Sequence, residues 1–311
     1  MKIAVVFPGQ ASQYVGMGKA LADCFPAAAA TLEEADQALG EPFRRLLWEG
    51  PQEALNLTAN TQPAVLAVSV AAWRVLRSAV PNLAPAYLAG HSLGEYSAHV
   101  AAGTLSFSDA LGAVRRRGLY MQEAVPVGEG AMAALMGMEF ADVVKACAEA
   151  AKDGSVVPAN DNAPGQVVIA GRADSVQAAV ERAKSLGCRK AVPLPVSAPF
   201  HSPLMAKARE RLEPVLRAIP FADPSWPVVA NVDLTPVRTG EEARDRLLRQ
   251  VDAPVRWRET MEFMRSQGVD TVVEVGPGTV LSGLAKRVDR NWRMLNVEDP
   301  ASLDKAVAAL I

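Results

Sequence analysis

One segment of the sequence has the residue types and spacing of an activated nucleophile. An apolar run leads into Gly90-His91-Ser92-Leu93-Gly94 and then into a helical pattern. Glycines on both sides of a serine let a strand turn sharply into a helix and raise the hydroxyl above the sheet. A Gly-x-Ser-x-Gly pattern also arises by chance in turns, but the flanking strand and helix favour Ser92 as a nucleophile. The amide of Leu93, at the helix N-terminus, is the expected oxyanion donor.

A serine hydroxyl needs a base within hydrogen-bond reach, and the chain has three histidines. His91 adjoins the serine and is expected to support the turn. His99 lies about two helical turns beyond Ser92 and is expected to be a packed or surface residue. His201 lies in a loop, 195–205, that three prolines stiffen, as a site of fixed geometry requires. We therefore expect His201 to be the general base.

Secondary structure must position these side chains, and apolar runs alternate with amphipathic helical stretches along the chain. The runs interpreted as strands are 3–7, 87–90, 228–231 and 271–275. Such alternation is typical of an α/β fold with a mostly parallel sheet. The length of 311 residues also allows two structural units.

The middle of the chain has a different order of predicted strands and helices. Its segments are interpreted as strand, helix, strand, strand, helix and strand at 131–136, 141–151, 156–159, 166–170, 175–186 and 189–194. This order is that of a ferredoxin-like unit. Prolines and glycines flank the unit, so we expect a small subdomain over 128–197 inserted into a large α/β subdomain, 1–127 and 198–311. The binding site is expected in the cleft between them.

Composition and charge exclude several functional classes. Half of the residues are hydrophobic, as is typical of a soluble globular enzyme. The 32 basic residues nearly balance the 34 acidic ones, so no overall field favours nucleic acid or an anionic membrane. The N-terminal apolar run is too short for a signal peptide or a membrane span. The three cysteines lack disulfide or metal-ligand spacing, so we expect a cytoplasmic protein with no metal and no redox cofactor.

Six short motifs follow one another along the chain. They are Phe7-Pro8-Gly9-Gln10 with Ser12-Gln13, Gly90-His91-Ser92-Leu93-Gly94-Glu95-Tyr96, Arg117-Gly118 with Met121-Gln122, Asn162-Ala163-Pro164-Gly165-Gln166, Pro199-Phe200-His201, and Glu274-Val275-Gly276-Pro277-Gly278. Together they resemble the malonyl-CoA:acyl carrier protein transacylases of fatty-acid synthesis over essentially the whole chain. The resemblance implies an α/β-hydrolase-like large subdomain with an inserted ferredoxin-like small subdomain.

The resemblance also implies a ping-pong mechanism. In such enzymes the serine takes the malonyl group from coenzyme A, and the histidine acts as general base and then acid. The phosphopantetheine thiol of acyl carrier protein then attacks the ester. The amide of Gln10 is expected to complete the oxyanion hole with that of Leu93. A backbone carbonyl near Gln250 is expected to orient His201, and Asp161 is an alternative by chain order alone.

Arg117 is the residue expected to bind the free carboxylate of the substrate. A guanidinium offers two parallel donors to a carboxylate, which lysine does not. Arg115 and Arg116 adjoin it, but successive helical side chains turn by about 100°, so these two are expected on a solvated face. A neutral acyl chain would leave Arg117 unpaired at a cost of about 1–3 kcal/mol, so acetyl transfer should be poor.

Three more residues are assigned to the substrate site: Phe200, Gln250 and Asn162. In related synthase domains a bulky residue before the histidine goes with malonyl units. Phe200 therefore predicts malonyl over methylmalonyl, although Pro199 is an extra residue in that motif. Asn160 and Asn162 precede a Pro-Gly turn, and capping this turn is an alternative to contacting a ligand.

Other functions use parts of the same pattern. A thioesterase or carboxylesterase has the same elbow and base, but Arg117 and the ferredoxin-like insertion favour transfer of a carboxylated acyl group. A free-standing polyketide acyltransferase and the malonyl-transfer subunit of malonate decarboxylase share most motifs, and Leu93 and Glu95 favour the fatty-acid enzyme. A non-catalytic acyl-CoA-binding module would not need both Ser92 and His201.

The expected partners are malonyl-CoA, as a substrate rather than a cofactor, and acyl carrier protein. The carrier is usually acidic, so docking is expected on basic residues beside the cleft. The candidates are Arg189, Lys190, Lys286 and Arg287. The chain is expected to act as a monomer.

Overall fold

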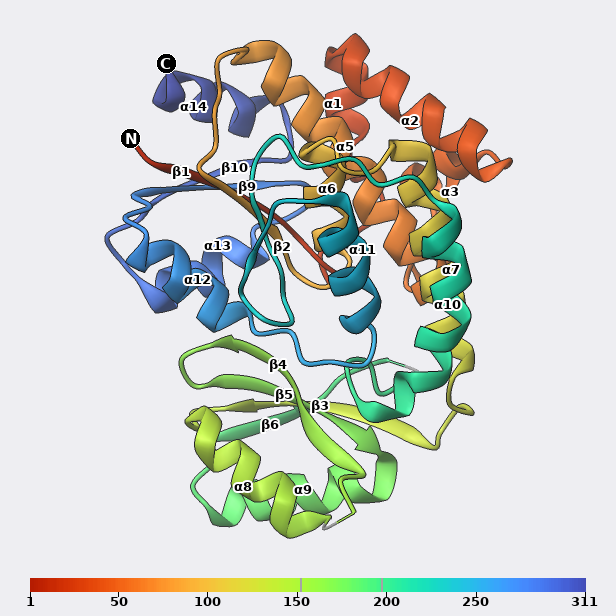
Figure 1. Cartoon of the computed structure of the whole chain (residues 1–311), viewed down its shortest axis with the longest axis vertical. Helices are drawn as coiled ribbons and strands as arrows, with labels where there is room; N and C mark the ends of the chain where they lie inside the picture. Colours follow the sequence, from red (N-terminus) through yellow and green to blue (C-terminus); the bar gives the residue numbers. More distant parts are fainter. Residues whose placement is uncertain (152, 197) are drawn as a thin grey trace.

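The computed structural model describes residues 1–151, 153–196 and 198–311, which form two lobes (Figure 1). Each lobe is built around its own sheet, of six strands in the large lobe and four in the small lobe. Both termini lie at the end of the large lobe that is far from the small lobe (Figure 1). The predicted α/β architecture is therefore confirmed.

The large sheet has the strand order β10-β9-β1-β2-β7-β8. Its strands are β1 (Ile3–Phe7), β2 (Tyr87–Gly90), β7 (Val228–Val229), β8 (Pro236–Val237), β9 (Thr271–Val275) and β10 (Arg293–Val297). All neighbouring strands are parallel except β7 and β8. The four predicted runs are β1, β2, β7 and β9. The sequence does not predict β8, which has two residues, or β10, whose apolar pattern is interrupted by Arg293 and Asn296.

Strand β7 ends at Val229, before the predicted end at residue 231. The prediction is wrong there because Asn231 turns out of the sheet. Its backbone N–H donates to the carboxylate of Glu95 at 3.0 Å instead of to a neighbouring strand. This departure places the Asn231 side chain beside the segment that follows β2.

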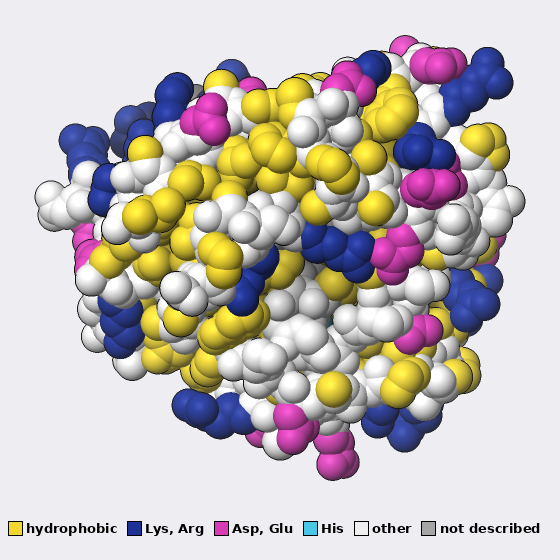
Figure 2. Space-filling view, turned by 90° about the horizontal axis from the view of Figure 1, so that it is seen from above, with side chains coloured by type: hydrophobic (Ala, Val, Ile, Leu, Met, Phe, Trp, Pro, Cys, Tyr) yellow, Lys and Arg dark blue, Asp and Glu magenta, His cyan; other side chains and the backbone are white. Residues whose placement is uncertain are grey.

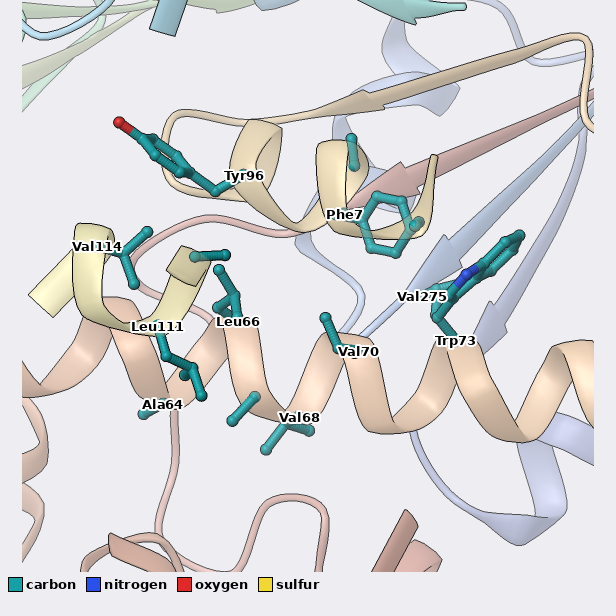
Figure 3. Close-up of a cluster of buried hydrophobic side chains, with 14 of the residues drawn as sticks. Phe7, Ala64, Leu66, Val68, Val70, Trp73, Tyr96, Leu111, Val114 and Val275 are labelled. Atoms are coloured by element: carbon teal, nitrogen blue, oxygen red, sulfur yellow. The ribbon is translucent and has the colours of Figure 1, made fainter. Parts of the chain in front are cut away.

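Helices cover both faces of the large sheet, which explains its continuous apolar runs. They are α1 (Lys19–Cys24), α2 (Pro26–Leu39), α3 (Phe43–Glu49), α4 (Gln52–Leu55), α5 (Thr58–Ala79), α6 (Gly94–Ala101), α7 (Phe107–Glu123), α10 (Ala206–Ala218), α11 (Gly240–Arg249), α12 (Trp257–Ser266), α13 (Val280–Val288) and α14 (Pro300–Leu310), with the short 3₁₀ helix η1 (Pro203–Met205). On one face Trp73 of α5 lies beside Phe7 and Val275 (Figure 3). On the other face Val6 packs in a cluster with Trp257 of α12.

The small lobe has the predicted β-α-β-β-α-β order. Its elements are β3 (Gly130–Met136), α8 (Phe140–Ala150), β4 (Val156–Ala163), β5 (Gln166–Arg172), α9 (Ala173–Ser185) and β6 (Lys190–Pro193). The sheet is antiparallel with the order β4-β5-β3-β6, as in a ferredoxin-like unit. Strand β4 continues beyond the predicted end at residue 159, so Asn160 and Asn162 lie within a strand. The predicted boundary at residue 197 lies outside the described residues.

The two lobes share a core and a backbone contact. One face of the small sheet packs under α8 and α9, and the other, which includes Met132, belongs to the main core of the large lobe. Strand β4 also bonds to the segment before α12. The Asp161 N–H donates to the Val255 carbonyl, and the Val255 N–H donates to the Ala159 carbonyl, both at 2.9 Å. Side chains from both lobes are therefore held at fixed positions around the cleft.

No helix in the described part of the chain is long and apolar enough to cross a membrane. On the face shown in Figure 2, basic and acidic side chains are interspersed around apolar areas. This mixture agrees with the small net charge of −2.

Candidate active site

The turn between β2 and α6 is the nucleophile elbow. Ser92 has a φ of 53°, a left-handed conformation that is unfavourable for a residue with a Cβ. A Cβ at Gly90 would overlap the backbone of Gly94, and a Cβ at Gly94 would overlap the carbonyl of Phe7. Only glycine fits at these two positions, so the strained turn can form.

Asn231 holds the elbow in this conformation. Its Oδ1 accepts the Ser92 backbone N–H at 2.9 Å, and its Nδ2 donates to the Gly90 carbonyl at 2.8 Å. Asn231 is not among the site residues that the sequence predicts. The available signal is its place at the end of the predicted parallel strand 228–231, because binding sites in α/β sheets lie at the carboxyl ends of strands.

His201 lies against the Ser92 hydroxyl. Its Nε2 is 2.7 Å from Ser92 Oγ. Its Nδ1 faces the backbone carbonyls of Gln250 at 3.1 Å and Ala253 at 3.2 Å. Because a carbonyl only accepts hydrogen bonds, Nδ1 carries the proton and Nε2 is free to accept from the serine. The Gln250 carbonyl lies where the resemblance places it, and Ala253 is a further acceptor.

The environment of His201 keeps the imidazole neutral. Burial, with Arg117 and His91 nearby, lowers the pKa of His201 to about 3. A neutral imidazole at physiological pH is the form that can take a proton from a hydroxyl. The alternative acid, Asp161, instead forms an ion pair with Arg258 at 2.8 Å. Its carboxylate is therefore engaged away from His201.

The other two histidines have different surroundings. His91 Nε2 is 2.8 Å from Oδ1 of Asn162, and its ring lies edge-on to Trp257. Asn162, assigned to the substrate site by resemblance, is thus placed against His91, whereas Asn160 lines the pocket. His99 is completely buried in α6, and neither ring nitrogen has a hydrogen-bond partner within the described residues. Of the two predicted alternatives for His99, the packed position is therefore correct.

Arg117 of α7 is buried with its guanidinium beside the nucleophile. Its side chain is 1% exposed. Nη1 donates to Gln62 Oε1 at 2.8 Å, and Nη2 donates to Gln250 Oε1 at 2.9 Å and to Ser92 Oγ at 3.2 Å. Burial lowers the pKa of Arg117 from the usual arginine value. All three acceptors are neutral, so the guanidinium has no carboxylate bound directly to it through these contacts.

The neighbours of Arg117 on α7 point elsewhere. Arg115 pairs with Glu41 at 3.1 Å, and Arg116 is exposed, as the helical geometry predicts. Gln62 is a partner of Arg117 that is not predicted from the sequence. Its only signal is that a polar residue lies within the largely apolar stretch of α5.

The side chain of Gln250 connects several residues of the site through hydrogen bonds. Its Nε2 donates to the Ser92 carbonyl at 3.0 Å and to Glu95 Oε2 at 2.7 Å. Its side chain is completely buried and does not line the pocket. The structure therefore places Gln250 behind Ser92, His201 and Arg117 rather than in the substrate space to which the resemblance assigns it.

Ser92, His201 and Arg117 open onto one pocket of about 120 Å³. Its apolar lining comes from both lobes and from the segment that joins them: Met121, Met132, Leu194, Val196 and Phe200. Pockets for drug-sized ligands are typically about 300–1,000 Å³. The smaller volume suits a short acyl group, and Phe200 lies where it limits that volume.

Gln10 and Leu93 line the same pocket. Within the described residues, neither backbone amide donates a hydrogen bond, whereas the Gln10 side chain donates to Thr58 Oγ1 at 3.4 Å. Unpaired amides next to a nucleophile are suited to hold a developing oxyanion. In the same described part of the chain, no cluster of three or more His, Cys, Asp or Glu side chains could hold a metal ion.

Comparison with known proteins gives a consistent assignment. The chain matches the acyl transferase domain family over residues 4–302. It is 45% identical to the malonyl CoA-acyl carrier protein transacylase of Bacillus subtilis, over 99% of this chain and 97% of that protein. It is 47% identical to the transacylase of the same name from Escherichia coli K12, over 98% of this chain and 99% of that protein.

Solved structures agree with these relatives. An acyl carrier protein S-malonyltransferase from Vibrio cholerae superposes with a TM-score of 0.96 at 47% identity, covering 98% of this chain and 100% of that chain. A malonyl-transacylase in complex with a type II PKS acyl-carrier protein has a TM-score of 0.96 at 46% identity, covering 99% of this chain and 100% of that chain. The chain therefore belongs to the malonyl CoA-acyl carrier protein transacylase family of acyl transferases.

Proposed function

We propose that this protein transfers a malonyl group from malonyl-CoA to the phosphopantetheine thiol of acyl carrier protein, through an ester on Ser92, and so supplies fatty-acid synthesis. The observation that carries the proposal is the arrangement of Arg117. Its buried guanidinium donates to Ser92 Oγ at 3.2 Å, and its three side-chain hydrogen bonds within the described residues all go to neutral acceptors. A carboxylated acyl group on Ser92 would supply the missing negative charge.

In the first half-reaction His201 Nε2 accepts the hydroxyl proton while Ser92 Oγ attacks the thioester carbon. The amides of Gln10 and Leu93 hold the carbonyl oxygen as it becomes negative. The C–S bond then breaks, and His201 returns the proton to the coenzyme A thiolate. In the second half-reaction the carrier thiol gives its proton to His201 and attacks the ester carbon, and Ser92 recovers its proton as the C–O bond breaks.

Gln250 is proposed to support this cycle in two ways. Its backbone carbonyl accepts from His201 Nδ1 and stabilises the imidazolium that forms during each half-reaction. Its side-chain oxygen accepts from Arg117 and so keeps the guanidinium beside Ser92. Both contacts are through groups that do not touch the substrate space.

Phe200 is proposed to favour malonyl over methylmalonyl groups, because its ring lines the small pocket. A Phe200→Ser variant should gain methylmalonyl transfer relative to malonyl transfer, measured with equal concentrations of the two CoA thioesters. An unchanged ratio would contradict this role.

A thioesterase or carboxylesterase is the second candidate, because it would use the same Ser92 and His201 pair. The experiment that separates them is intact-protein mass spectrometry after mixing with malonyl-CoA alone, beside a Ser92→Ala variant. A malonyl-sized gain on the wild type alone, removed by phosphopantetheinylated carrier, is expected. Steady release of coenzyme A with no adduct would indicate a hydrolase, and neither adduct nor turnover would indicate an acyl-CoA-binding module.

The carrier is proposed to dock on basic residues at the edge of both lobes. Arg189 and Arg287 line one surface hollow, and Lys286 lies beside Arg287 on α13. Arg287 also donates to the Pro164 carbonyl and to Gln166 of the small lobe at 2.6 Å each. Reversing the charges of Lys190 and Lys286, which no salt bridge within the described residues engages, should weaken transfer to the carrier and spare acylation by malonyl-CoA. Equal loss of both steps would contradict the docking site.

We also propose that the protein works as a monomer in the cytoplasm, with no cofactor and no role in binding nucleic acid or membranes. The supporting observations are the free thiols of Cys24, Cys147 and Cys188 and the nearly balanced charge. Sedimentation of the purified protein with and without carrier tests the oligomeric state. A stable dimer in the absence of carrier would contradict the monomer.

A further inference from the structure

Glu95 is a buried carboxylate for which the transfer mechanism has no use. It lies in the first turn of α6 and is completely buried. Its Oε2 accepts from the side-chain Nε2 of Gln250 at 2.7 Å and from the backbone N–H of Asn231 at 3.0 Å. A buried charge is costly unless it is hydrogen-bonded or paired. Here amide donors, rather than the guanidinium of an arginine, supply both hydrogen bonds.

The surroundings of Gln250 permit only one orientation of its side-chain amide. The amide nitrogen faces three acceptors, which are Glu95 Oε2, the Ser92 carbonyl and, at 3.4 Å, Asn231 Oδ1. The amide oxygen faces a donor, Nη2 of Arg117. Rotating the amide by 180° would bring its oxygen against the carboxylate and its NH₂ against the guanidinium. Both contacts would be repulsive. Glu95 provides the shortest of the hydrogen bonds to the amide nitrogen and the only charged acceptor among them, so it contributes most to directing the amide oxygen towards Arg117.

We propose that Glu95 is a positioning residue for substrate selection: by fixing the Gln250 amide, it holds the Arg117 guanidinium beside Ser92, where a carboxylated acyl group is recognised. The proposal rests on the malonyl transfer proposed above. It extends that function, because Glu95 contacts neither the pocket nor Ser92 Oγ. Its influence on the acyl group passes through Gln250.

An amide between the two charges has a physical advantage over direct contact. A carboxylate bonded directly to Arg117 would occupy the parallel donors that the substrate needs. Through Gln250, Glu95 positions the guanidinium without forming a hydrogen bond to it. The influence is mutual: burial raises the pKa of Glu95 to about 7, and Arg117 opposes that rise.

The test is the ratio of malonyl to acetyl transfer, taken as the ratio of the two kcat/KM values for acylation of Ser92. This ratio reports on Arg117 and is insensitive to a general loss of Ser92 reactivity, because such a loss affects both substrates. The variants are Glu95→Ala, Glu95→Gln, Gln250→Ala and the double variant Glu95→Ala/Gln250→Ala. Gln250→Ala keeps the backbone carbonyl that His201 uses. Glu274→Ala is the matched control, because Glu274 is also fully buried and accepts from the backbone amides of Leu281 and Ser282.

We expect Glu95→Ala to lower the ratio about 10- to 100-fold, mainly through a higher KM for malonyl-CoA. Glu95→Gln keeps an acceptor oxygen towards Gln250 and Asn231, so it should stay within about threefold of wild type. In the Gln250→Ala background, removing Glu95 should change the ratio less than about twofold. Glu274→Ala should keep the wild-type ratio even if its thermal stability falls.

Three results would overturn the proposal: a wild-type ratio in Glu95→Ala, an equal loss in Glu95→Gln, or the same additional loss in the Gln250→Ala background. If Glu95→Ala does not fold, the other two single variants test the proposal. Glu95→Gln must then keep the malonyl-to-acetyl ratio, and Gln250→Ala must lower it. Failure of the wild type itself to form a malonyl adduct would contradict the proposed function. A normal wild-type adduct with an unchanged ratio in Glu95→Ala would contradict only the role of Glu95.

Discussion

The two lobes contribute different kinds of group to the same pocket. The large lobe supplies Ser92, His201 and Arg117 together with the apolar Met121 and Phe200, whereas the small lobe supplies the apolar Met132 and the neutral Asn160. The groups of the large lobe are buried and held by side-chain hydrogen bonds, whereas the Met132 side chain packs within the hydrophobic core. Proton transfer and charge recognition need fixed distances, but limiting the size of an acyl group needs only filled volume. The two properties should therefore be separable by mutation.

The largest expected effect comes from removing the reacting pair of the large lobe. Ser92→Ala should abolish the acyl-enzyme. His201→Ala should lower kcat by about 10³-fold or more, because within the described residues no other base forms a hydrogen bond with Ser92 Oγ. Intact mass spectrometry with malonyl-CoA and steady-state kinetics measure the two effects. Formation of a malonyl adduct on Ser92→Ala would locate the nucleophile elsewhere.

Arg117→Lys should have the next largest effect. Lysine keeps the charge but lacks the parallel donors, so kcat/KM for malonyl-CoA should fall about 10- to 100-fold while acetyl transfer changes little. The exposed neighbour provides the control: Arg116→Lys should behave as wild type. Equal losses for malonyl-CoA and acetyl-CoA would mean that Arg117 acts on Ser92 and not on the substrate carboxylate.

A change in the small lobe should alter size selection and leave the chemistry intact. Met132→Ala enlarges the pocket, so methylmalonyl transfer relative to malonyl transfer should rise a few-fold, with a loss of stability of about 2–5 kcal/mol. Leu135→Ala is the control, because Leu135 packs on the opposite face of the same strand, under α8 and α9. A change of selectivity in Leu135→Ala would show that loosening of the small lobe, rather than pocket volume, is responsible.

The smallest expected effect is a difference between the lobes in how folding stability changes at acid pH. All three histidines lie outside the small lobe, and burial lowers the pKa of His99 to about 3. Between this value and the ordinary pKa near 6.5, the unfolded chain binds a proton that the folded chain does not. This contribution to stability is therefore complete above about pH 6.5 and is lost as the pH falls, by at most about 1.4 kcal/mol per pH unit.

The free energy of unfolding of His99→Leu should consequently depend less on pH, between about pH 6.5 and 4, than that of wild type. The five tryptophans all lie outside the small lobe, so their fluorescence during urea unfolding reports on the large lobe. The pKa of Glu95 is raised to about 7, so its contribution to stability changes with pH in the opposite direction. Glu95 is present in both proteins, and the comparison with wild type therefore removes its contribution. Identical pH dependence in the two proteins would mean that His99 does not set the acid sensitivity.

Much of the fold could be predicted because its signals are local. Four parallel strands, the elbow and the β-α-β-β-α-β order follow from apolar periodicity and from glycine and proline positions in neighbouring residues. The errors fall where the signal is weak. Strand β10 lies at an edge with a mixed pattern, β8 has two residues, and the end of β7 depends on a contact between Asn231 and Glu95.

The residues of the site likewise divide into those that local sequence patterns reveal and those that they do not. Ser92, His201 and Arg117 are recognisable from motifs, since each lies within a short pattern of residues that its chemistry requires. Among their supporting partners, Asn231 and Gln62 are not recognisable and Gln250 is found only through the family resemblance, because these residues come from far along the chain. Asn231 is 139 residues from the Ser92 amide that it holds, and Gln250 is 158 residues from the Ser92 carbonyl. Hydrogen-bond partners separated by such distances leave no periodic pattern, and only the folded backbone brings them together.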